Sequence, residues 1–333
     1  MGVAALHIDA GCYETHWWPH PPQYSPPGCM VFLAEKVKQV VSLPVIAVGR
    51  LHYPEVAEKA LADGKADFIA IGRGLLAEPE WVNKVQSGKT DELVPCLGCH
   101  EGCKWQMIAG EPTSCALNPT CGHEIEWALT PLKEKRSLLV VGGGPAGIEA
   151  ARVGAERGFE VILWEASDRL GGNLWLAAKP DFKHDILDYV NYLNDLVKRL
   201  PIDVIFNKKA SADDIKNFGA DYVIIATGAQ MEPPTIEGDN VLTTFQVMSG
   251  MQPEGVRILI MGAGVIGCET AVYLAGQGKE VDLSARMDAD DLDMDTIDHN
   301  NRFMPVSYTH LRAHETVRWI SYAVFCLKRG GGG

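Results

Sequence analysis

Short apolar runs alternate with an amphipathic stretch over the first 95 residues. The runs at 3–11, 44–50 and 67–74 each contain or end in glycine, as strands that stop at a turn do. Between the last two, residues 54–64 place apolar side chains at helical spacing and end at a glycine. Strands that alternate with helices predict a parallel sheet.

Residues 12–29 interrupt this pattern. Five prolines exclude regular secondary structure there, and aromatic and histidine side chains lie among them. A loop of this composition after a parallel strand suggests the lip of a binding site. A surface loop stiffened by proline is the alternative.

Two later stretches, 137–166 and 257–285, share one pattern of strand, glycine-rich turn, helix and strand. They start about 120 residues apart and predict a repeat of one β-α-β fold. Between them, residues 221–229 read as a strand that runs into a turn of small residues. Residues 305–333 follow no such pattern and end in four glycines.

The first β-α-β stretch has the pattern of a dinucleotide site. Gly142 permits a tight turn, Gly144 lets a pyrophosphate approach the backbone, and Gly147 lets the helix pack closely on the strand. Glu165, at the end of the next strand, would accept hydrogen bonds from ribose hydroxyls. Two further turns, at Gly172 and at Thr227–Gly228, are expected to cover the same ligand.

The second stretch repeats the three glycines as Gly262, Gly264 and Gly267. The position that matches the acid holds Ala285, followed by Arg286. An arginine there can pair with a 2′-phosphate, which favours NADPH, although a solvated surface arginine is an alternative. Two dinucleotide units in one chain predict one flavin and one nicotinamide.

Four cysteines, Cys96, Cys99, Cys103 and Cys115, have the spacing C-x2-C-x3-C-x11-C. Thiolates suit iron–sulfur clusters and zinc, and one 4Fe–4S cluster takes four of them. The x3 gap fits zinc less well, so we expect a cluster, with structural zinc and buried thiols as alternatives. Cys121 lies off the pattern and is expected to be a buried, inert thiol.

Charge and hydropathy exclude several classes of function. The formal net charge of −13 argues against a nucleic-acid partner, which would need a basic face. The N-terminus lacks the pattern of a signal peptide, and no apolar stretch of about 18 residues predicts a membrane span. Clustered cysteines without a secretion signal indicate a reducing, cytoplasmic compartment.

With PCLGCHEGC, Cys115 and GGGPAG in view, the chain resembles the NADH:flavin oxidoreductases related to 2,4-dienoyl-CoA reductase, 2-enoate reductase and trimethylamine dehydrogenase. The resemblance implies an α/β fold: the C-terminal part of a TIM barrel, a 4Fe–4S segment and a glutathione-reductase-type FAD/NAD(P)-binding module. It divides the chain into 1–95 (FMN barrel part), 96–125 (cluster), 126–250 (FAD), 251–304 (partial NAD(P) domain) and a tail. The tail, 305–333, is expected to be non-native, and its two histidines with Glu315 are not expected to bind metal.

The resemblance also implies roles for the ends of two barrel strands. Gly49 and Arg50 after one, and Gly72 and Arg73 after the next, would hold the phosphate of FMN through backbone donors and guanidinium groups. Arginines that cap the barrel surface are the alternative.

The family's dienoyl-CoA reductases use a histidine in an earlier loop to deliver a proton to the substrate. The matching position here is Tyr13, and His16 follows three residues later. Either is a candidate general acid, and either could simply line the pocket.

The resemblance implies that NAD(P)H reduces FAD, and that electrons pass through the cluster to FMN and then to an activated C=C bond of an enoate or enoyl-CoA. One alternative is an amine dehydrogenase of the trimethylamine type, with electrons flowing out of FMN. The other is an inactive, truncated fragment, because only three barrel strands and part of the nucleotide module are evident. The oligomeric state is not predicted.

Overall fold

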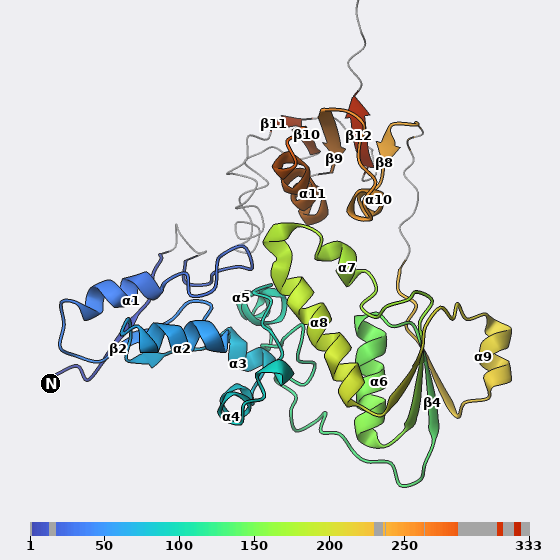
Figure 1. Ribbon diagram of the computed structural model, residues 1–333, viewed down its shortest axis with the longest axis horizontal. Coiled ribbons are helices and arrows are strands. Elements are labelled where there is room, and N and C mark those ends of the chain that lie inside the picture. Colours follow the sequence, from blue (N-terminus) through green and yellow to red (C-terminus); the bar gives the residue numbers. More distant parts are fainter. Residues whose placement is uncertain are drawn as a thin grey trace, which may run out of the picture.

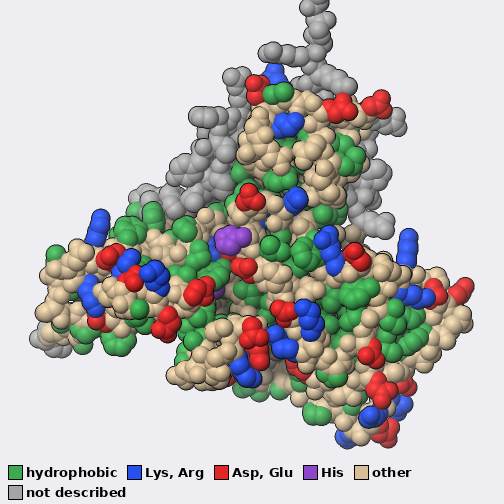
Figure 2. Space-filling view, in the orientation of Figure 1, with side chains coloured by type: hydrophobic (Ala, Val, Ile, Leu, Met, Phe, Trp, Pro, Cys, Tyr) green, Lys and Arg blue, Asp and Glu red, His purple; other side chains and the backbone are tan. Residues whose placement is uncertain are grey.

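The computed structural model describes residues 2–12, 18–229, 236, 238–262 and 264–285, and the backbone of two strands at 312–315 and 323–327. Figure 1 shows three units: the cysteine segment at 96–125 lies between the N-terminal unit and the first nucleotide unit, and the second nucleotide unit lies above helices α7 and α8. No helix among the described residues is long and apolar enough to cross a bilayer. Acidic and basic side chains are interspersed over the face shown in Figure 2.

The N-terminal unit, residues 2–95, contains a small parallel sheet in the order β1-β2-β3. Apolar residues of β2 pack on helix α1 in a core that includes Ala34 and Val45. The sheet and its helices confirm the β/α alternation expected from the sequence. The elements are β1 Leu6–Ile8, α1 Val31–Lys38, β2 Val45–Ala47, α2 Pro54–Ala62, β3 Phe68–Ile69, α3 Arg73–Ala77 and α4 Trp81–Gln86.

The cysteine segment has little regular structure. It contains one π-helical turn, Glu101–Trp105, followed by the short helix α5, Gln106–Ala109. His100, just before the turn, has a φ of 64°, a left-handed conformation that reverses the chain between two cysteines.

The first nucleotide unit, residues 136–228, has four parallel strands in the order β6-β5-β4-β7. Helices α6 and α8 pack together beside the sheet (Figure 1), and their apolar faces share a core with β4 and β5. The elements are β4 Ser137–Val141, α6 Pro145–Arg157, β5 Glu160–Trp164, α7 Leu174–Ala177, α8 His184–Arg199, β6 Ile202–Ile205, α9 Ala212–Phe218 and β7 Tyr222–Ile225.

The second nucleotide unit, from residue 238 onward, has the strand order β11-β10-β9-β12-β8. Val247 and Leu242 pack into its core, so β8 and α10 belong to this unit and precede the boundary expected at 250. Its elements are β8 Val241–Leu242, α10 Thr244–Met248, β9 Arg257–Met261, α11 Val265–Gly276, β10 Glu280–Ala285, β11 Arg312–Glu315 and β12 Ala323–Leu327.

Strands β11 and β12 come from the tail for which the sequence predicted no structural context. The backbone of β11 pairs in parallel with β10, and β12 pairs antiparallel with β9 and β8.

Candidate cofactor sites

The four predicted cluster cysteines lie around one cavity of about 20 Å3. The π-helical turn carries Cys103, and Ser114 next to Cys115 donates from its backbone to the carbonyl of Gly102 at 2.8 Å. A Cβ on Gly102 would lie 2.6 Å from the Ser114 hydroxyl, so only glycine lets these two loops meet. This contact brings the distant fourth cysteine to the other three.

The chemistry of this cavity suits a cationic cluster. Burial, and then the charges of Cys96, Cys103 and Cys115, together raise the pKa of the Cys99 thiol to about 12. Four thiolates packed in this way repel one another unless a positive group binds them. The described residues offer no group of three ligands close enough to share one metal ion.

Cys121 is buried but does not line this cavity. Its pKa is raised by burial and then by the nearby cysteines, so it stays a protonated thiol near neutral pH.

A second cavity, of about 180 Å3, brings together the four residues expected to hold an FMN phosphate. Gly49, Arg50, Gly72 and Arg73 all line it. A Cβ on Gly72 would meet nothing within 4 Å, so the space above this glycine is open.

The two arginines of this cavity also bind groups of the protein itself. Arg73 contacts Nε2 of His100 and donates to the carbonyl of Pro21 at 2.9 Å. The terminal nitrogens of Arg50 are also bound within the protein. Nε of Arg50 and Nε2 of His52 are buried without a hydrogen-bond partner among the described residues. The Nε–H of Arg50 can therefore donate to a bound anion, whereas its terminal nitrogens are already engaged.

The electrostatic field of the cavity also suits an anion. The pKa of His52 is lowered to about 3, first by burial and then by the positive charges of Arg50 and Arg73. His52 is therefore a neutral imidazole near pH 7. The positive charges of Arg50 and Arg73 favour a phosphate, whereas burial by itself disfavours a charge of either sign.

The first nucleotide unit arranges its glycines as the sequence predicts. Gly142 has a φ of 110°, and a Cβ there would lie 2.2 Å from the carbonyl oxygen of Ala226. That close approach puts the turn with Thr227 and Gly228 against the glycine loop. A Cβ on Gly172 would lie 3.1 Å from the Cα of Gly144, so a third turn closes on the same loop. Three turns thus bring their backbones together around the expected pyrophosphate.

Glu165 lies at the end of β5, beside this loop. Its carboxylate accepts from the backbone of Gly143 at 2.6 Å and from the backbone and hydroxyl of Ser167 at 2.7 and 2.8 Å. Burial alone raises its pKa, but the hydrogen bonds from Ser167 and Gly143 lower it more, so the group is ionised. The remaining lone pairs can accept from a ribose.

The second nucleotide unit repeats the geometry of the first. Cβ atoms on Gly147 and Gly267 would each lie 1.8 Å from a glycine carbonyl, that of Gly142 or Gly262. Gly264 begins α11 as Gly144 begins α6, with an extended backbone. Tyr13, His16 and Arg286 lie outside the described residues.

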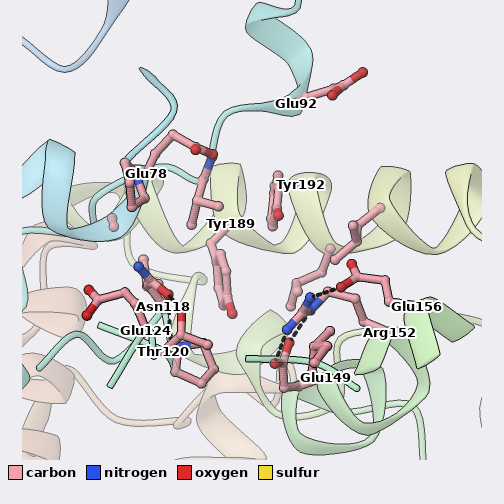
Figure 3. Close-up of a pocket in the computed structure, with 18 of the residues that line it drawn as sticks. Glu78, Glu92, Asn118, Thr120, Glu124, Glu149, Arg152, Glu156, Tyr189 and Tyr192 are labelled. Atoms are coloured by element: carbon pink, nitrogen blue, oxygen red, sulfur yellow. Dashed lines mark hydrogen bonds and ion pairs between the residues drawn. The ribbon is translucent and has the colours of Figure 1, made fainter. Parts of the chain in front are cut away.

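A larger cavity, of about 450 Å3, lies where the N-terminal unit, the cysteine segment and helices α6 and α8 meet. Tyr189 and Tyr192 project into it from α8, and Arg152 is ion-paired with Glu149 and Glu156 at its side (Figure 3). The sequence did not predict this space, because it is formed by segments far apart in the chain.

Comparison with known proteins identifies the family. Residues 18–92 match the model of the NADH:flavin oxidoreductase / NADH oxidase family, and residues 136–289 match that of the pyridine nucleotide-disulphide oxidoreductases. The chain belongs to the NADH:flavin oxidoreductase family. Its α/β fold class and resemblance are thereby confirmed, and the family's enzymes use FMN, FAD and nicotinamide.

Individual relatives agree with this assignment. A cinnamate reductase of Clostridium sporogenes is 42% identical over 283 residues, which cover 85% of this chain and 43% of the relative. An NADH oxidase of Thermoanaerobacter brockii is 38% identical over 89% of the chain and 47% of its own length. Amine dehydrogenases are similar at lower identity.

Among solved structures, a 2-naphthoyl-CoA reductase bound to 2-naphthoyl-CoA has a TM-score of 0.86 and 30% identity. The match covers 93% of this chain and 48% of that one. The chain thus spans less than half the length of these relatives.

Proposed function

We propose that this chain carries the electron-transfer part of an NAD(P)H-dependent flavin and 4Fe–4S reductase that acts on the C=C bond of an enoate or enoyl-CoA. The observation that carries the proposal is a shared wall. Arg73, Cys96 and Gly98 line both the cysteine cavity and the cavity assigned to the FMN phosphate. Groups bound in the two cavities would therefore both lie against these three residues.

The protein's own residues hold and orient the cofactors. The four cysteines would bind the cluster, the Gly142–Gly147 loop would bind FAD, and the Gly262–Gly267 loop would bind the nicotinamide. When bound, these groups supply hydride acceptance, single-electron transfer and hydride donation. Tyr13 and His16 are our candidates for the proton donor to the substrate.

The substrate class rests on two of the relatives, a cinnamate reductase and a 2-naphthoyl-CoA reductase. The amine dehydrogenase alternative is less favoured, because the second nucleotide loop retains all three glycines. Stopped-flow mixing with NADH and with NADPH separates the two functions. Flavin bleaching by either nucleotide supports the reductase, and bleaching by neither supports the amine dehydrogenase.

The cysteine site has a direct test. Protein purified without oxygen is expected to contain iron and acid-labile sulfide, and Cys115→Ser is expected to lose most of both, because one corner of the cluster then has no thiolate. Cys121→Ser is the matched control, since Cys121 is buried nearby but does not line the cavity. Absence of iron and sulfide from the unmodified protein would contradict the proposal.

A further inference from the structure

A buried ion pair joins the N-terminal unit to the first nucleotide unit. Nη2 of Arg50 donates to Oδ2 of Asp185, in the first turn of α8, and the two side chains are 1% and 0% exposed. The hydroxyl of Tyr53 donates to the other carboxylate oxygen at 2.8 Å. Ion pairs this deeply buried contribute little net stability, because desolvation offsets their attraction. The Arg50–Asp185 pair is therefore expected to have a role other than stabilising the fold.

The other end of the Arg50 guanidinium holds a loop. Its Nη1 donates to the carbonyl oxygens of Pro22 at 3.0 Å, Gln23 at 2.8 Å and Ser25. Because one guanidinium nitrogen binds three carbonyl oxygens of this loop, it fixes the backbone of residues 22–25. A planar guanidinium can do this while it binds a carboxylate through its second nitrogen.

The loop that Arg50 holds packs directly on the cysteine segment. A Cβ on Gly98 would lie 3.0 Å from the backbone nitrogen of Gln23 and 3.2 Å from the carbonyl carbon of Pro22. Gly98 lies between Cys96 and Cys99 and is part of the wall shared by the two cavities. The preceding residues, Pro19 and Pro21, line the cavity assigned to FMN.

We propose that Asp185 is a positioning residue: through Arg50 it holds the 22–25 loop against Gly98, and so fixes the cysteine loop relative to the FMN cavity. The carboxylate comes from the nucleotide unit, so the wall between the two cavities forms only when the units are docked. The role given to this positioning rests on the proposed function, whereas the contacts among Asp185, Arg50 and the 22–25 loop do not depend on it.

Two variants separate positioning from stability. Arg50→Met with Asp185→Leu removes both buried charges, which is often neutral or stabilising for a pair of this kind. Arg50→Lys keeps the ion pair but cannot hold three carbonyls with a compact ammonium group while it binds Asp185. Asp195→Asn is the control, because Asp195 lies on the same helix in an exposed pair with Lys198.

The measurement is hydrogen–deuterium exchange of residues 19–28 and 96–103 in the chain without iron, together with the melting temperature. In both test variants we expect melting close to that of the unmodified chain, but exchange in 96–103 faster by roughly tenfold or more. The control should change neither. Unchanged exchange in a variant that melts normally would overturn the proposal, because the ion pair would then not position the cysteine loop.

Reconstitution with iron and sulfide gives an independent readout. The test variants should lose the cluster to a chelator several times faster than the unmodified chain and the control. If the unmodified chain takes up no cluster, the proposed function fails, while the exchange data still decide whether Asp185 positions the cysteine loop.

Discussion

At the scale of single residues, the spacing of the dinucleotide glycines predicted close backbone contacts. The spacing identified Gly147 and Gly267 as contacts between helix and turn, and the structure leaves no space for a Cβ at either. Arg50 was predicted less well. Its place after a barrel strand suggested a phosphate ligand, but most of its donors bind carbonyls and Asp185. A partner 135 residues away on another unit leaves no local signal in the sequence.

The glycine contacts can be tested on one helix. Gly267→Ala would put a methyl group 1.8 Å from the carbonyl oxygen of Gly262, so α11 must shift away from the turn. We expect a loss of about 1–3 kcal/mol in stability and weaker binding of NAD(P)H. Gly276→Ala, at the end of the same helix, meets nothing within 4 Å and should stabilise by about 0.5–1 kcal/mol.

Calorimetric titration with the nucleotide and thermal unfolding of both variants provide the measurement. Equal effects from the two substitutions would mean that helix propensity, rather than the close approach at the turn, governs this position.

At the scale of elements, the sequence predicted most strands and helices correctly because their apolar patterns are local. The proline-rich stretch was harder to interpret. Its residues were expected to form a binding lip or a surface loop, yet part of it is a junction: Pro22 faces Gly98, and Tyr24 donates to Glu269 at 3.1 Å. A polar loop that joins other units has the same composition as an exposed one, so only the tertiary contacts reveal it.

The contact at Glu269 links α11 of the second nucleotide unit to the rest of the molecule. Glu269 also pairs with Lys183 at 2.7 Å, and the two side chains are 14% and 10% exposed. Glu269→Ala leaves the Lys183 ammonium largely buried without this partner, at a cost of about 3 kcal/mol or less. We expect the second nucleotide unit to become mobile and the radius of gyration from X-ray scattering to increase.

The control for this variant is Glu280→Ala, an exposed glutamate of the same unit on β10. An unchanged scattering profile for Glu269→Ala, with the expected loss of stability, would show that the pair stabilises the unit without setting its orientation.

At the scale of the whole molecule, the hydrophobic cores are separate. The buried clusters of the described residues belong to the N-terminal unit, to the first nucleotide unit or to the second, and none spans two of them. The contacts across the junctions that we describe are polar, as at Arg50–Asp185 and Lys183–Glu269. The order of the units could be predicted from motifs in sequence, whereas these junctions could not.

Separate cores joined by polar contacts should unfold in separate steps. Calorimetry of the chain is therefore expected to show more than one transition rather than a single two-state one.

A ligand that binds one folded unit raises the free energy of unfolding of that unit alone, and therefore its transition temperature. The gain is about 2.7 kcal/mol at a ligand concentration 100 times the dissociation constant. FAD should shift the transition of the unit that contains Gly142–Gly147, and NADPH or NADH that of the unit that contains Gly262–Gly267. Gly147→Ala should remove the first shift alone and Gly267→Ala the second alone. A single transition that either nucleotide raises equally would show that the polar junctions couple the units as strongly as a shared core, and the assignment of one nucleotide to each unit would then need direct binding data.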